Sequence, residues 1–280
     1  MESLISYFET IPSAHRAAIL FGGLAIFFLI ENALPLFTEA YDKKKHTSLN
    51  IFFTLTTIVV NFSMAFILAA AALFVHENSF GLLHWIGANV WVQLILGLLL
   101  LDFFGAWLAH YIEHHVTWMW QFHVIHHTDQ NVDTTTANRH HPGESVIRFI
   151  FTTVAVLLIG APMWLVFLYQ SLSVVLTQFN HSNVKMPEGL DKALRLVFCT
   201  PNMHRVHHHY RQPYSDTNYG NIFSFWDRIF GTYAVVDNSK LKYGVDTYMD
   251  RAQTESVMDL LKIPFQGYKT HIQYKEEEKL

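Results

Sequence analysis

The chain of 280 residues is 51% hydrophobic and only 15% charged, with a formal net charge of −4. Soluble domains carry about 25% charged residues, so this chain is short of polar surface, and its net charge gives no case for nucleic-acid binding. Its single cysteine, Cys199, excludes an internal disulfide, a CxxC redox pair and a cysteine-ligated iron–sulfur cluster. The sequence also contains no GxGxxG or P-loop motif for a nicotinamide, a flavin or ATP.

Four long windows are almost free of charge. The first, 17–37, holds only Glu31, and the windows 50–75, 85–101 and 149–180 hold no charged residue. A membrane-spanning helix needs about 20 apolar residues, so each of the first three can cross a bilayer once. The fourth is long enough for two short crossings joined at Gly160-Ala161-Pro162, a helix-breaking turn.

The sequence therefore predicts an all-α integral membrane protein with about four to five transmembrane helices, including a hairpin over 149–180. The alternative is a set of buried core helices in a large soluble protein. Lys43, Lys44 and Lys45 lie between the first two apolar segments, and basic loops favour the cytoplasm. Alternating crossings then place 110–145 and 181–280 on the cytoplasmic side, together with every histidine cluster.

This topology predicts three regions in a multi-pass protein of the bacterial inner membrane or the endoplasmic reticulum. Residues 1–109 form the N-terminal transmembrane helices. Residues 110–236 form a catalytic region with the histidine boxes, the membrane hairpin and a cytoplasmic helical cap. Residues 237–280 are expected to be a solvated cytoplasmic tail, in which LLKIPF at 260–265 is a candidate for contact with the membrane surface.

Thirteen of the eighteen histidines fall between 110 and 209. HYIEHH (110–115) places His110 and His114 at i and i+4, on one helical face. FHVIHH (122–127) and MHRVHH (203–208) share the spacing HxxHH, which is expected to offer three imidazoles from one helical face. A lone His181 follows in FNHSN.

Eight or nine histidines are more than one metal ion can bind, because zinc sites use about four ligands. The count predicts two metal ions close together, although any one box alone is more often surface histidine or a simple zinc site. Zinc does not change its oxidation state and would suit hydrolysis, for which no nucleophile motif is present. Iron with open coordination positions activates dioxygen.

Several fixed spacings occur together between 102 and 233. HxxxH and HxxHH are separated by the eight residues HVTWMWQF, and TANRHHPGE supplies Thr136, Arg139, His141, Pro142 and Glu144. His181-Ser182-Asn183 follows, and then PNMHRVHH from Pro201, DTNYG from Asp216 and WDRIFGT from Trp226. This pattern resembles the fatty acid hydroxylase/sterol desaturase superfamily of membrane histidine-box di-iron oxygenases. Two departures are Tyr111, where that family commonly has Arg, and Asp102, which is displaced by one residue.

The resemblance implies a set of metal ligands and no further catalytic or cofactor-binding residue. The implied ligands are His110, His114, His123, His126, His127, His181, His204, His207 and His208. His141 is either a tenth ligand or a group that supports one. His115, His140 and His209 fall outside the pattern and are expected to be non-ligands.

The resemblance also implies an activity: two iron ions (Fe2+/Fe3+), dioxygen and external electrons would hydroxylate or desaturate a C–H bond of a lipid, such as a sterol or fatty acyl substrate. The chain has no electron-carrying motif of its own, so we expect a separate donor, a ferredoxin or a small cytochrome with its reductase. The alternatives are a histidine-rich metal-binding or transport protein, whose ligands should lie near the membrane midplane, and a bis-histidine haem protein.

Overall fold

The structure is a computed structural model that describes residues 1–38 and 41–272. The residues it describes form helices and loops, with no β-strand beyond isolated bridges. The long helices are α2 (Ser13–Ala33), α3 (Lys43–Asn78), α5 (Val90–Asp102), α8 (Pro142–Ile159) and α9 (Met163–His181). The helices that carry the remaining histidine boxes are α6 (Leu108–His115), α7 (Thr117–His127) and α11 (Pro201–His207), with the π-helix η1 (Phe103–Trp107) joining α5 to α6. The predicted all-α fold is confirmed.

The remaining elements are short. They are α1 (Glu2–Glu9), α4 (Leu82–Trp85), α10 (Glu188–Leu194), α12 (Phe225–Ile229), α13 (Arg251–Thr254) and α14 (Val257–Lys262), with the single turns η2 (Thr134–Asn138), η3 (Tyr214–Asp216), η4 (Asn238–Lys240) and η5 (Ile263–Phe265).

Four helical segments of the described chain are long and apolar enough to cross a membrane: Ser13–Ala33, Lys43–Trp85, Val90–His115 and Pro142–Ile159. Large apolar side chains point outward from the first two, and Phe62 is 83% exposed, Phe66 70% and Leu29 69%. A contiguous apolar surface of this kind is stable only against lipid. The prediction of about four to five transmembrane helices is therefore confirmed.

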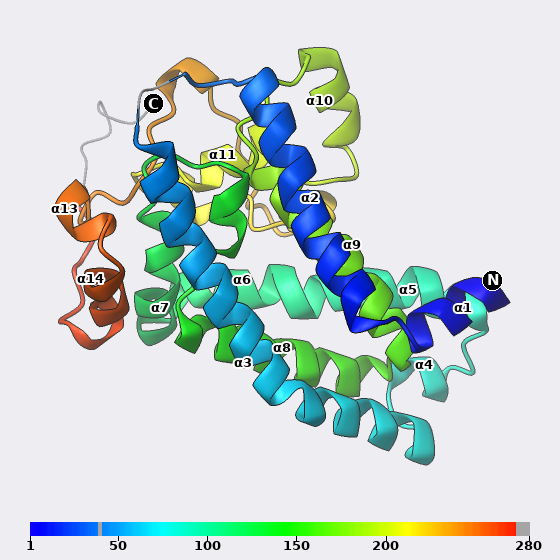
Figure 1. Cartoon of the computed structure of the whole chain (residues 1–280). Helices are drawn as coiled ribbons and strands as arrows, with labels where there is room; N and C mark the ends of the chain where they lie inside the picture. The colour runs from blue at the N-terminus through cyan, green and yellow to red at the C-terminus, as the bar shows by residue number, and fades with distance from the viewer. Residues whose placement is uncertain (39–40, 273–280) are drawn as a thin grey trace.

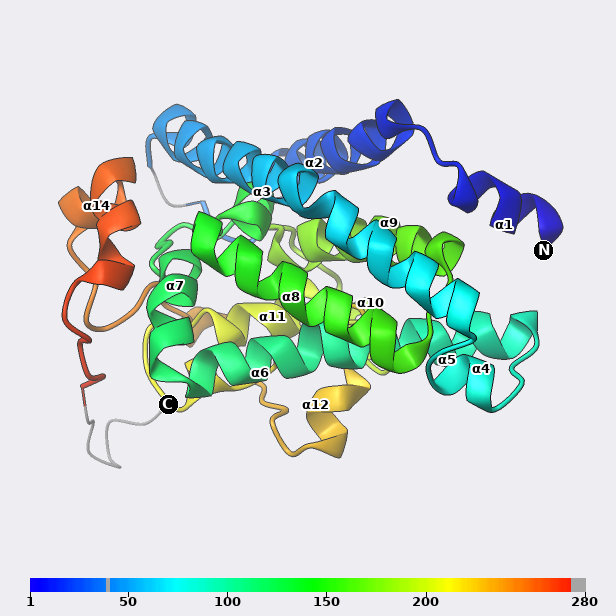
Figure 2. The same ribbon diagram turned by 90° about the horizontal axis from the view of Figure 1, so that it is seen from below.

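The helical hairpin predicted over 149–180 is present as α8 and α9, and of its two helices α8 is a candidate membrane span. Gly160 ends α8 in the left-handed conformation, with φ 74°, and Pro162 precedes the first turn of α9. The hairpin is the centre of the bundle, because α3 packs on α8, α2 packs on α9, and α5 with η1 packs on both. Figure 2 shows α8 running beside α6, with α3 crossing the bundle, and Figure 1 shows α9 behind α2.

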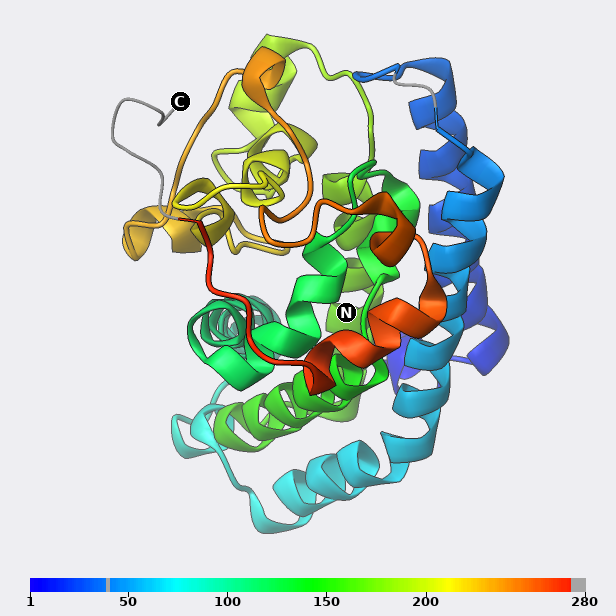
Figure 3. The ribbon, with the colours of Figure 1, turned by 90° about the vertical axis from the view of Figure 1, so that its left-hand side faces the viewer.

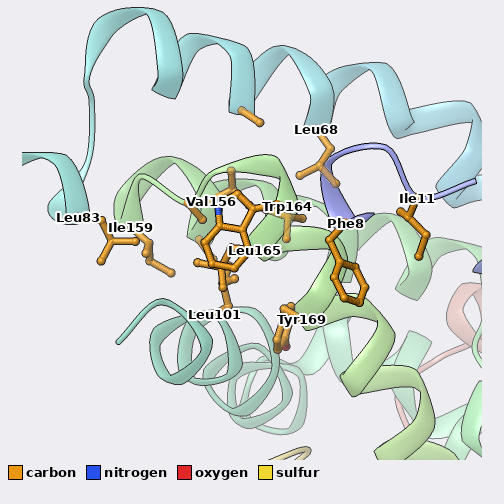
Figure 4. Close-up of a cluster of buried hydrophobic side chains, with 14 of the residues drawn as sticks. Phe8, Ile11, Leu68, Leu83, Leu101, Val156, Ile159, Trp164, Leu165 and Tyr169 are labelled. Carbon is orange, nitrogen blue, oxygen red and sulfur yellow. The ribbon is translucent and has the colours of Figure 1, made fainter. Parts of the chain in front are cut away.

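The apolar core lies where these helices meet (Figure 4). Trp164 and Leu165 of α9 pack against Val156 of α8 and Leu101 of α5, and all four are buried. Lipid is as apolar as these side chains, so helices in a membrane associate mainly through close packing. Gly97 of α5 permits that packing, because a Cβ atom there would collide with the side chain of Leu165.

The expectation of a solvated tail is wrong for the part of the C-terminal region that packs on α7. Val245, Leu260 and Ile263 are 2%, 0% and 0% exposed, and they pack with Val124 and Ile125 of α7 in a second core. Helices α13 and α14 lie beside α7 (Figure 1, Figure 3). Their apolar residues are too few and too irregularly spaced to predict this packing from the sequence. The terminal KEEEKL lies outside the described residues.

The α8–α9 turn provides a stability test. Gly160→Ala should destabilise the protein in two ways, since a left-handed alanine costs about 1 kcal/mol and its Cβ would lie 2.5 Å from the carbonyl oxygen of Phe80. The matched control is Gly87→Ala, which has φ 62° but open space around the new Cβ. Thermal unfolding of the detergent-solubilised protein should show a clearly larger loss for Gly160→Ala. Equal losses of thermal stability would show that the close approach of the backbone at Gly160 does not add to the destabilisation.

Candidate metal centre

Nine histidines from α6, α7, α9 and the C-terminal end of α11 converge in the structure. They form two groups, in each of which one ligand atom per residue lies within 4.8 Å of all the others. The first group is His110, His114, His123, His127 and His207, and the second is His126, His181, His204 and His208. The structure thus brings together nine of the ten histidines proposed from the sequence and leaves out His141.

The two HxxHH boxes are divided between the groups. In α7, the i,i+4 pair His123 and His127 joins the first group, while His126 points to the second. At α11 the arrangement is reversed, because His204 and His208 join the second group and His207 joins the first. Residues four apart share a helical face, whereas the residue beside them is rotated by about 100°. Each box therefore contributes to both groups, rather than three imidazoles to one.

Five of these rings have their Nδ1 atom bonded to an acceptor that carries no proton. The pairs are His110 with the carbonyl oxygen of Tyr219 at 3.1 Å, His114 with Asp216 at 3.0 Å, His123 with Glu144 at 2.7 Å, His181 with the carbonyl oxygen of Thr177 at 2.8 Å, and His207 with that of Thr217 at 2.7 Å. Since carbonyl and ionised carboxylate oxygens only accept hydrogen bonds, Nδ1 must carry the proton in each ring. The Nε2 atom of a neutral ring then carries no proton and presents a lone pair.

These Nε2 atoms face one another. Those of His110 and His123 are 3.0 Å apart, and those of His123 and His127 are 3.1 Å apart. Since His110 and His123 both hold their proton on Nδ1, no hydrogen bond joins their Nε2 atoms, and two lone pairs meet in a buried site. In the second group the Nε2 atom of His181 lies 3.1 Å from those of His126 and His204.

A bound cation removes this repulsion. Nitrogens that lie about 2.1 Å from a shared ion and at right angles to each other are about 3.0 Å apart, which matches the observed spacing. In addition, the Nε2 atoms of His207 and His208 are buried and have no hydrogen-bond partner. The donor set of both groups therefore fits metal ions.

Burial keeps these rings in the ligand form. It lowers the pKa of His123 to about 3, despite the opposing effect of Glu144. Burial together with neighbouring imidazoles holds the pKa values of His126 and His207 well below the usual range. Only the neutral ring binds a metal, so no proton has to leave these sites at neutral pH before an ion binds.

The π-helix η1 aligns the first box with the rest of the site. In a continuous α-helix, Asp102 and His110 would lie about 80° apart around the axis. A π turn takes up one extra residue, which reduces the separation to about 20°. Both side chains then contact the 219–226 segment: His110 bonds the carbonyl oxygen of Tyr219, and Asp102 accepts the N–H groups of Ile222 and Phe223. The one-residue displacement of Asp102 is thus absorbed by η1.

Arg139 fastens the end of α7. Its buried guanidinium donates to the carbonyl oxygen of Ile125, to the hydroxyl of Thr128 and to the carbonyl oxygen of Thr254. Cations are favourable at the C-terminal end of a helix, where carbonyl groups lack partners. Arg139 therefore links the last turn of α7, which carries His126 and His127, to the C-terminal region.

The other histidines of the region have different contacts. His141 accepts the N–H of Gly143 at its Nδ1 and caps α8. His140 uses both ring nitrogens, on Glu144 and on the carbonyl oxygen of Ala137, and its ring stacks on that of His126. His115 bonds the carbonyl oxygen of Tyr111, and His209 accepts the N–H of Arg211.

Sequence reasoning assigned no role to the groups that orient the rings. Asp216 acts through its side chain and stands in the DTNYG motif, which is the signal that could have identified it. The carbonyl oxygens of Thr177, Thr217 and Tyr219 have no residue-specific signal, because any residue supplies a backbone carbonyl.

The family model "Fatty acid hydroxylase" matches residues 94–232, which include both histidine groups. Residues 94–232 therefore form a fatty acid hydroxylase domain. It is 28% identical to ornithine lipid hydroxylase OlsE of Rhizobium tropici over 75% of this chain and 64% of that protein. It is 33% identical to human alkylglycerol monooxygenase, over 58% of this chain and 34% of that protein. No solved structure matches the chain significantly.

The match to a third relative extends over most of that protein's length. The chain is 25% identical to a putative methylsterol monooxygenase of Dictyostelium discoideum, over 82% of this chain and 85% of that protein. Of the first two relatives, the chain spans 64% and 34%, so it matches only part of each. Together with the four candidate spans, these matches identify this chain as a multi-pass membrane protein.

The division into two groups predicts a change in metal content. His207→Ala removes one ligand of the first group only, so the purified protein should fall from about two bound metal ions per chain toward one. His15→Ala, which changes a histidine far outside both groups, should leave the content unchanged. Inductively coupled plasma mass spectrometry measures both. A full metal complement in His207→Ala would contradict the assignment.

The carboxylate behind His114 provides a second test. Asp216→Asn keeps the shape of the side chain but removes its charge, and the loss of such an outer partner typically weakens metal binding by about 10- to 100-fold. Competition with a chelator should therefore extract metal more readily from this variant. Asp259→Asn on α14, where Asp259 is solvent-exposed and 3.9 Å from Lys262, is the matched control. Identical extraction curves for the two variants would exclude the proposed role of Asp216.

Proposed function

We propose that this protein is a membrane-bound oxygenase that holds two iron ions and hydroxylates, or desaturates, a C–H bond of a lipid. The observation that carries the proposal is the pair of buried histidine groups whose ring nitrogens converge at the ends of apolar helices. When bound, a pair of iron ions supplies the redox chemistry through which dioxygen is reduced and an oxygen atom is transferred.

The donor set favours iron over zinc. Nine imidazoles exceed what two four-coordinate zinc ions need, whereas iron accepts a larger number of imidazole ligands and changes its oxidation state during turnover. The nearest carboxylates, Glu144 and Asp216, bond to the Nδ1 atoms of His123 and His114. They therefore orient ligands.

The chain's own residues prepare the site by orienting the imidazoles and excluding water. Hydrogen bonds at Nδ1 fix the tautomer and direct Nε2 inward, which increases the basicity of the ligand. Trp120 covers one side, with its ring 4.7 Å from that of His114 and 5.3 Å from that of His127. A dry, aromatic-lined site suits an unactivated C–H bond, since it has little affinity for polar molecules.

Hydroxylation by this route needs a partner. One oxygen atom of dioxygen enters the C–H bond and the other leaves as water, with two electrons and two protons from outside. We assign the electrons to a separate ferredoxin or small cytochrome with its reductase, because the sequence has no nucleotide-binding motif and only one cysteine. In desaturation the same electrons reduce dioxygen to two water molecules while the lipid loses two hydrogen atoms.

The relatives support a lipid as substrate, since their names describe a hydroxylase of ornithine lipid and monooxygenases of alkylglycerol and methylsterol. The three lysines at 43–45 support a cytoplasmic position for the site. On this basis we propose that residues 1–109 anchor the protein in the membrane and that 110–236 carry the chemistry.

A lipidome comparison tests the proposal. Membranes that contain the wild-type protein, a suitable donor and oxygen should accumulate a lipid that has gained one oxygen atom or lost two hydrogen atoms. His126→Ala removes a ligand of the second group and should reduce this product by more than about 100-fold, beyond the loss of an outer partner, whereas His15→Ala should not. A normal yield from His126→Ala would overturn the proposal. Metal uptake into vesicles without any lipid product would favour a transporter instead.

A further inference from the structure

A pocket of about 340 Å³ lies beneath the loop that joins α2 to α3. Phe37 and Tyr41 of that loop form one wall, and the segment Gln130–Val132, Asn183 and the 241–251 region form the others. Its volume is within the range of small-molecule sites, about 300–1,000 Å³. Neither the histidine motifs nor the family match assigns it a role.

The pocket borders the metal centre through three separate segments. Gln130 follows His127 by three residues, and Asn183 follows His181 by two. Tyr243 forms a β-bridge with His209, which is next to His208. Consecutive Cα atoms are 3.8 Å apart, so the Cα atom of Asn183 lies within about 7.6 Å of that of His181. The pocket wall is therefore linked, within three residues of chain or through one β-bridge, to members of both histidine groups.

The charged residues that line the pocket within 1–38 and 41–272 are both basic. Lys242 and Arg251 line it, and no acidic residue does so within the described chain. Neither cation forms an ion pair with a described residue. Instead, the ammonium group of Lys242 lies 4.9 Å from the ring centre of Tyr210, a cation–π contact that leaves the charge available to an anion.

The rest of the lining is mixed. Phe37, Leu241 and Met249 are apolar, whereas Gln130 and Asn183 carry amides. The pocket also lies at the ends of two membrane spans, α2 and α3, the level at which lipid headgroups meet water. A site that combines two cations, amides and apolar surface at this level fits an anionic amphiphile better than a purely apolar molecule.

We propose that this pocket binds the phosphate or carboxylate headgroup of a lipid, with Lys242 and Arg251 as the anion-binding residues. The inference rests on the proposed function in one respect, namely that the bound lipid is the substrate whose chain is oxidised. It names the substrate class as an anionic lipid rather than a sterol, whose hydroxyl carries no charge.

Binding of two matched lipids to the full-length protein, purified with its bound metal in neutral detergent and kept without oxygen or an electron donor, tests the proposal. Oleoyl lysophosphatidic acid and monooleoylglycerol share the acyl chain and the glycerol but differ by the phosphate. Native mass spectrometry should show that the phosphate-bearing lipid binds at least about tenfold more tightly, as expected for charge-assisted hydrogen bonds. The double variant Lys242→Gln/Arg251→Gln should reduce that preference to less than about twofold.

The control is Lys240→Gln, which removes a nearby exposed charge outside the pocket and should keep the preference. Equal binding of the two lipids by the wild type, or the same loss in Lys240→Gln as in the double variant, would overturn the proposal. Displacement of the lipid by an equal concentration of inorganic phosphate would assign the pocket to a soluble anion and overturn the lipid assignment.

These measurements are independent of turnover, so the two proposals can fail separately. Loss of the anion preference in a protein that still oxidises a lipid would contradict only the pocket assignment. An intact preference in a protein that binds no iron and yields no product would contradict only the proposed function.

Discussion

The metal centre is possible only because the repulsion between neutral imidazoles, held together in a buried site, is overcome. The Nε2 atoms of His110 and His123 lie 3.0 Å apart with no proton between them, and burial lowers the pKa of His123 to about 3. Such an arrangement is stable only when the surrounding chain holds each ring in place and a cation occupies the centre. The carbonyl and carboxylate partners at Nδ1, the π-helix before α6 and the guanidinium at the end of α7 all provide that support.

The apolar helices take part in this support through the few charged residues that they contain. Glu31, in the first membrane span, accepts the N–H groups of Thr134 and Asn183. Asp102, in the third, accepts those of Ile222 and Phe223. A carboxylate inside an apolar span is costly unless its oxygens are satisfied. Here backbone N–H groups satisfy the carboxylate oxygens and offset this cost. The same hydrogen bonds attach the loops that flank the histidine helices to the membrane bundle.

Two HxxHH boxes are needed because each one serves both groups. A helical turn directs an i,i+4 pair to one side and the intervening histidine to another, so one box supplies two ligands to one group and one to the other. The second box supplies the reverse. His181, at the end of the hairpin, adds to the second group, while α6 adds two rings to the first. The interleaving makes the two groups interdependent, since a shift of either helix disturbs both.

The sequence by itself determined the long apolar helices and the hairpin turn at Gly160, because apolar length and glycine act locally. Its resemblance to a known family implied the nine converging histidines, together with His141, which lies outside both groups. Only the tertiary structure decided which histidine joins which group, since the ring directions depend on how α6, α7, α9 and α11 cross. The acceptors behind the rings were also undecided, because a backbone carbonyl such as that of Tyr219 has no residue-specific signal. Nor could the sequence place the C-terminal region: Leu260 and Ile263 are buried only because α7 offers them a matching apolar surface.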